Sequence, residues 1–135
     1  MSSWTDARAY LRRSGLRLKI ADPDLIGVEW TVRGPSGPIQ QRQLISAVTA
    51  FGVEYLQIMS LVASANALSP LDALVKNSEL LIGSVCLIDN TYVVRAILPL
   101  ENLDTVALDR TLRVVANEAA RLGARTPRAA APYYE

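Results

Sequence analysis

Four carboxylates lie close together in the second half of the sequence: Asp89, Glu101, Asp104 and Asp109. A pair of carboxylates can act as general acid and base, or can hold a hard cation. Each aspartate also has a local structural explanation, because Asp89 suits a turn, Asp104 suits a helix cap, and Asp109 lies where a helix start favours negative charge. We therefore expect structural roles here, and a carboxylate-dependent enzyme remains the weaker alternative.

The residue types that most enzymes and metal sites require are scarce in this chain. Its 135 residues include no histidine, which removes the commonest general base and the commonest transition-metal ligand. Cys86 is the single cysteine, so a zinc site would depend on carboxylates alone, and the glycines form no phosphate-binding motif. We expect no catalytic residue, no metal site and no cofactor.

Charge and hydropathy restrict the class of partner. The net charge is +1, from 14 basic and 13 acidic residues. Such a balance lacks the excess of basic residues that is typical of nucleic-acid-binding domains. Half of the residues are hydrophobic and only 20% are charged, which leaves room for an apolar surface used in association. We expect a protein partner and no nucleic acid. The basic residues near the N-terminus are expected on a solvated face: Arg8, Arg12, Arg13, Arg17 and Lys19.

The sequence contains no apolar run long enough to cross a bilayer, and its N-terminus has no apolar core of signal-peptide length. Cys86 has no second cysteine with which to form an intrachain disulfide. We therefore expect a soluble cytoplasmic protein with no membrane partner.

A β-hairpin followed by a long helix organises the C-terminal half. Asp89-Asn90 separates two apolar strands, 84–88 and 91–98, which is the pattern of a tight hairpin turn. Apolar residues then recur at helical spacing from Leu108 to Leu122, after a cap at Asp104 or Asn102. We expect Gly123 to end this helix in a left-handed conformation. A sheet and a helix that each have one apolar side must cover one another.

The N-terminal half is predicted to begin with a short helix from Trp4, ended by Ser14-Gly15, and two half-buried strands, 16–20 and 26–32. Residues 34–38 contain two glycines and two prolines and predict a rigid loop. Residues 41–63 fit either one long helix or two strands. We favour strands 42–51 and 53–62, hinged at Gly52, because β-branched and aromatic residues dominate.

A short helix is expected from Ser69-Pro70 to about Ser78, with Leu71, Leu74 and Val75 on its inner side. The whole pattern predicts a single α+β domain over residues 1–122, an antiparallel sheet backed by an N-terminal helix and a long C-terminal helix. Residues 123–135 are expected to form a flexible tail.

This order of elements, from Trp4 to Leu122, resembles the YbjN-like family. The resemblance rests on Gln41-Arg42-Gln43 leading into paired strands, Asn77 before the hairpin, and LPLENLD at 98–104 before an alanine-rich helix. That family is similar in fold to the type III secretion (Tir) chaperones. The resemblance implies a compact α/β sandwich, usually dimeric, that binds other proteins and catalyses nothing.

We therefore expect a non-catalytic protein-binding module, chaperone-like or regulatory, that acts as a homodimer. A partner segment would add to a sheet edge or lie along an apolar groove. The candidate partner-binding residues are Trp30, Tyr55, Met59 and Tyr92, because large aromatic side chains and methionine dominate binding energy when exposed. The main alternative is a carrier that encloses a small apolar ligand between sheet and helix.

Overall fold

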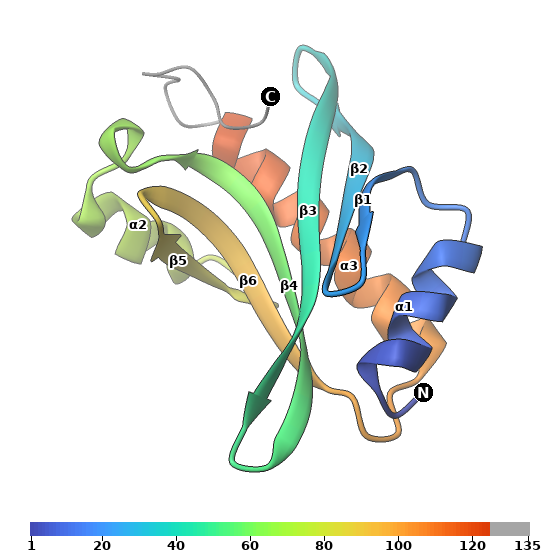
Figure 1. Cartoon of the computed structure of the whole chain (residues 1–135). Coiled ribbons are helices and arrows are strands. Elements are labelled where there is room, and N and C mark those ends of the chain that lie inside the picture. The colour runs from blue at the N-terminus through green and yellow to red at the C-terminus, as the bar shows by residue number, and fades with distance from the viewer. Residues whose placement is uncertain (125–135) are drawn as a thin grey trace.

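The computed structural model describes residues 1–124, and residues 125–135 lie outside the described part. The fold is mixed α+β, as predicted, with a six-stranded antiparallel sheet in the order β1-β2-β3-β4-β6-β5. An N-terminal helix, α1, and a long C-terminal helix, α3, accompany this sheet (Figure 1). Most of the tail predicted for residues 123–135 falls outside the described residues.

The regular elements follow the predicted order. In the first half they are α1 (Trp4–Arg13), β1 (Leu18–Asp22), β2 (Leu25–Gly34), β3 (Gly37–Ala50) and β4 (Val53–Ser64). A 3₁₀ turn, η1 (Ala65–Ala67), then leads to α2 (Pro70–Asn77), β5 (Ser84–Ile88), β6 (Thr91–Pro99) and α3 (Thr105–Ala124). Not one of the helices described up to residue 124 has the length and apolar character needed to span a membrane.

Two tight turns confirm the predicted hairpins. Asp89 and Asn90 have φ angles of 49° and 62°, and they join β5 to β6. Phe51 and Gly52 have φ angles of 54° and 75°, and they join β3 to β4. Two successive positive φ values match the twist of the flanking strands, which explains both turns. Residues 41–63 therefore contain the two predicted strands, and the long-helix alternative is wrong.

The rigid loop predicted for residues 34–38 is wrong in extent. β2 continues to Gly34 and β3 begins at Gly37, so only Pro35 and Ser36 remain as the turn. Gly37 has a φ of 123°, a value that a side chain disfavours. Pro38 pairs with Arg33 in a stretch of β3 before the pairing with β4 begins, where a strand tolerates a missing N–H donor.

Helix α3 begins as predicted but continues past its predicted end. The Asp104 carboxylate accepts a hydrogen bond from the Val106 N–H over 2.9 Å, which caps the N-terminus. Gly123 is helical rather than left-handed, so the predicted helix end there is wrong. A Cβ atom at Gly123 would lie 3.0 Å from the Val62 carbonyl oxygen. This glycine therefore permits close packing of α3 against β4.

The core lies between one face of the sheet and the helices. Ala7 and Leu11 of α1, Ala73 of α2, and most of the apolar stripe of α3 belong to one buried cluster. The sheet contributes alternate residues to this cluster: Ile26, Val28, Ile45, Leu56, Ile58, Val94 and Ala96. Because strand residues alternate between faces, the residues between them form a second face that the described helices leave uncovered.

Polar side chains join the layers inside this core. Gln43 is fully buried, and its amide nitrogen donates to the Ser60 hydroxyl and to the Leu112 carbonyl, both over 2.9 Å. Its carbonyl oxygen accepts a hydrogen bond from the Trp30 indole over 2.9 Å. A buried amide needs partners for all its groups, and this network supplies them from β2, β4 and α3.

Helix α2 is oriented opposite to the prediction. Leu71, Leu74 and Val75 face solvent with exposed fractions of 71%, 68% and 55%, whereas Ala73 is the buried residue. The predicted inner side of this helix is therefore its outer side. The small side chain of Ala73 allows the helix to approach the core closely, and the larger side chains lie outside the contact.

Candidate functional site

The structure does not assemble the four carboxylates into one cleft. Asp89 lies in the turn before β6, and Glu101 follows the opposite end of that strand, roughly 30 Å away for nine residues of strand. Asp104 caps α3, and Asp109 accepts a hydrogen bond from the Tyr10 hydroxyl over 2.7 Å. Within residues 1–124, no group of three or more cysteine and carboxylate side chains is arranged to hold a metal ion.

The uncovered face of the sheet, called the open face below, is the first candidate surface. Its residues on β3, β4 and β6 follow from the strand register: Arg42, Leu44, Ser46, Val48, Tyr55, Gln57, Met59, Leu61, Val93, Arg95 and Ile97. Leu44 is directly opposite Met59, and Val48 is directly opposite Tyr55. Most of these side chains are half-buried by their neighbours. The polar pair Ser46 and Gln57 lies between the apolar pairs Leu44–Met59 and Val48–Tyr55.

The open face carries unpaired positive charge. Within residues 1–124, Arg42 forms no ion pair, and its Nε atom is shielded from solvent without a hydrogen-bond partner. Arg95 makes a long hydrogen bond of 3.4 Å to the Gln57 side chain. Glu29 is directed toward β1, where it lies 3.5 Å from Arg17 and 3.9 Å from Lys19. Glu29 is directly opposite Arg42 in the register of β2 and β3, but its carboxylate is already engaged by these two cations.

The outer side of α2 is the second candidate surface. We call Leu71, Leu74 and Val75 the α2 patch, and Leu81 in the following loop is 96% exposed. Contiguous exposed apolar side chains of this size on a small protein commonly mark an association site. Asp72 and Lys76 lie beside the patch on the same helix, so the helix presents both charge signs.

Side chains occupy some of the backbone groups on both outer strands of the sheet. At β1, the Arg8 guanidinium donates to the Asp22 carbonyl over 3.1 Å and to the Ala21 carbonyl over 3.4 Å. At β5, the Asn77 side chain accepts the Val85 N–H over 2.8 Å. Side chains that occupy edge groups discourage pairing with another chain. A partner strand would compete with these side chains at Ala21, Asp22 and Val85.

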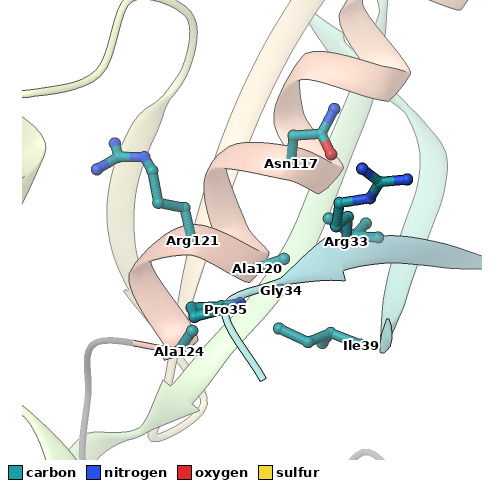
Figure 2. Close-up of a pocket in the computed structure, with 9 residues that line it drawn as sticks. Arg33, Gly34, Pro35, Ile39, Asn117, Ala120, Arg121 and Ala124 are labelled. Carbon is teal, nitrogen blue, oxygen red and sulfur yellow. The ribbon is translucent and has the colours of Figure 1, made fainter. Parts of the chain in front are cut away.

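A pocket of about 310 Å³ lies where the β2–β3 hairpin meets the C-terminal end of α3. Figure 2 shows Pro35, Ala120 and Ala124 close together at its centre, with Ile39 on one side and the Arg121 guanidinium directed away from it. Arg121 is engaged by Glu118 over 2.8 Å, and this contact raises the pKa of the guanidinium. The pocket therefore lies between one end of the sheet and the C-terminal end of α3.

The four candidate partner-binding residues separate into two groups. Tyr55 and Met59 lie on the open face, four residues apart on β4, with Gln57 between them. Trp30 lies on the covered face with its indole bonded to Gln43, and Tyr92 is 4% exposed in the core. The structure therefore brings two of the four to one accessible surface. Sequence reasoning missed Arg42, Arg95 and the α2 patch as surface features.

Comparisons with models of known protein families, with curated proteins and with solved structures found no match.

Proposed function

We propose that this chain is a non-catalytic protein-binding module that pairs with a second copy of itself through α2. The observation that carries this proposal is the α2 patch, where three large apolar side chains of an eight-residue helix face solvent. Burying each of them would contribute about 1.5–3 kcal/mol before the costs of association. Such a surface is stabilised when a partner covers it.

A second copy suits this patch because the helix is self-complementary in charge. Asp72 and Lys76 lie four residues apart along α2. In an antiparallel pair related by a two-fold axis near Leu74, Asp72 of one protomer lies nearest Lys76 of its partner. A two-fold interface uses the same patch twice, so this arrangement sets opposite charges beside an apolar centre.

Sedimentation equilibrium of the wild-type chain tests the proposal. We expect a mass of twice 14.7 kDa at micromolar concentration. The double variant Leu71→Ser/Leu74→Ser should sediment as a monomer, because the polar side chains remove the apolar centre. The matched control is Val106→Ser, since Val106 is 58% exposed on α3 and lies outside the patch. A wild-type monomer at about 100 μM would rule out the pairing.

The pocket at the end of α3 supports carriage of a small apolar ligand as a second candidate function. Its volume of about 310 Å³ reaches the lower end of the range for ligand sites, and Val32, Ile39 and Ala120 give it an apolar lining. A fluorescent naphthalene sulfonate is a suitable probe, because its ring fits an apolar pocket and Arg33 offers a cation. Carriage predicts saturable fluorescence that Ile39→Trp abolishes, and unsaturable fluorescence contradicts it.

A further inference from the structure

We propose that the open face of the sheet binds an amphipathic helix of a partner protein that carries acidic residues on both sides of its apolar stripe. This inference rests on the proposed function of protein binding and adds the chemistry of the partner. It is independent of the α2 patch, which belongs to a different part of the molecule. The open face supplies an apolar floor and two cations in a fixed arrangement.

The floor is built mainly on β4, the strand at the centre of the open face. Met59 and Leu61 lie on β4, and Leu44 of β3 is directly opposite Met59. The other face of the same sheet is covered by α3, whose buried side is apolar. A helix on the open face would complete a three-layer arrangement, in which both faces of a sheet are covered by helices.

The two cations border this floor on opposite sides. Arg42 lies on β3, next to Gln43, which pairs with Ser60 of β4. Arg95 lies on β6 and pairs with Met59, so β4 runs between the two arginines. Two strand spacings separate β3 from β6, which is roughly 10 Å. An α-helix with its side chains has a diameter of about 10–12 Å. A helix lying along β4 would therefore have one arginine on each side.

The chemistry of both arginines favours carboxylates. Neither forms an ion pair within residues 1–124, and the Arg42 Nε donor has no partner although it is shielded from solvent. Arginine pairs with carboxylates through two parallel N–H donors, and such charge-assisted bonds strengthen where water is excluded. Acidic residues on the flanks of a partner helix would satisfy both guanidinium groups.

Helices α1 and α3 of a second copy do not suit the role of this partner helix. Helix α1 carries a single acid, Asp6, against three arginines, and the apolar side of α3 already covers the other face. If the open faces of two copies packed together, Arg42 and Arg95 of one copy would lie near the arginines of the other. The repulsion between like charges would disfavour this arrangement. Nucleic acid is also disfavoured as a partner, because binding a phosphate backbone usually requires more cations than the two on this apolar surface.

Peptide binding to the full-length protein tests the proposal. The probe is a synthetic helix of about 18 residues with a leucine stripe and glutamates on both flanks. Its matched controls are the same peptide with lysines on the flanks and a scrambled peptide of identical composition. We expect the acidic peptide to bind at least about tenfold more tightly than either control in fluorescence anisotropy. Its affinity should fall as the ionic strength is raised to about 1 M.

Variants of the open face locate the site. Arg42→Gln/Arg95→Gln should weaken acidic-peptide binding by about tenfold or more and reduce its salt dependence. Arg42→Lys/Arg95→Lys should keep most of the salt dependence, because both charges remain. The control variant Arg110→Gln removes an exposed arginine of α3 and should leave binding unchanged. Unchanged thermal unfolding of each variant shows that the fold is intact.

Three results would overturn the proposal: equal binding of all three peptides, no loss in Arg42→Gln/Arg95→Gln, or tighter binding of a single-stranded oligonucleotide than of the acidic peptide. The last result would identify a nucleic-acid surface instead. Failure here is distinguishable from failure of the proposed pairing, because Leu71→Ser/Leu74→Ser should bind the acidic peptide as the wild type does. Its mass in sedimentation reports separately on the α2 patch.

Discussion

The side-chain amide of Gln43 donates a hydrogen bond to the Leu112 carbonyl over 2.9 Å, although 69 residues separate them in the chain. This bond connects β3 with the middle of α3 inside the core. The same side chain accepts the Trp30 indole N–H, so the tryptophan is held by the covered side of the sheet. Gln43 therefore fixes α3 on that side, and the opposite side remains the open face.

Replacing Gln43 should destabilise the fold. Gln43→Leu leaves the Trp30 indole and the Ser60 hydroxyl without their buried partner, and each unsatisfied group costs about 1–3 kcal/mol. We expect the free energy of unfolding in urea to fall by about 2–4 kcal/mol. The control Gln40→Leu changes an exposed glutamine of the same strand and should alter it by less than about 0.5 kcal/mol. Equal losses in both variants would contradict this role.

Replacing Phe51 in the β3–β4 turn should stabilise the fold. Phe51 is fully exposed and has a φ of 54°, a conformation that bulky residues disfavour and asparagine tolerates. Phe51→Asn creates the preferred asparagine-glycine turn with Gly52 and should stabilise the fold by about 0.5–1 kcal/mol in urea unfolding. Phe51→Ala keeps the disfavoured conformation and should give a smaller gain. A loss of stability in Phe51→Asn would show that the ring makes a contact in solution.

The contact between Tyr10 and Asp109 predicts a pH effect. The hydrogen bond to the Asp109 carboxylate, followed by burial and the negative charge, raises the pKa of Tyr10 above its ordinary value of 10.0. The neutral phenol is the favoured form in the fold, so this stabilisation is fully present below pH 10 and is lost as pH rises through the raised pKa.

A tyrosinate absorbance titration measures this shift. Subtracting the titration of Tyr10→Phe from that of the wild type isolates Tyr10, and Asp109→Asn should return its pKa toward 10. The free energy of unfolding of Tyr10→Phe should also fall less above pH 10 than that of the wild type, because the variant has no phenol to ionise at this position. A Tyr10 pKa unaffected by Asp109→Asn would mean that the hydrogen bond does not form in solution.

Sequence reasoning recovers most of the fold because local signals agree with the tertiary arrangement. The turns at Asp89-Asn90 and Gly52, the cap at Asp104 and the apolar stripe of α3 each specify one element from neighbouring residues. Gly123 shows the limit of such signals. A glycine near a helix end predicts a left-handed cap, but here the close approach of the Val62 carbonyl determines its role.

The candidate surfaces depend on arrangements that the sequence does not display. Arg42 and Arg95 are brought to one face because β6 pairs with β4, a contact between distant segments. The apolar stripe of α2 can be recognised in the sequence, but the sequence does not show whether the stripe faces the core or the solvent. In the structure the smaller Ala73 packs inward. Tyr55 and Met59 are candidates from side-chain type alone, and the register of β4 then places both on the open face.

Disulfide trapping at Leu74 tests the central claim most directly, because residues near a two-fold axis lie opposite their own copies. The variant Leu74→Cys in a Cys86→Ser background contains one exposed cysteine at the centre of the α2 patch. Pairing through α2 predicts rapid covalent dimerisation under mild oxidation, much faster than for Val106→Cys in the same background. Equal and slow cross-linking of the two variants would contradict the account.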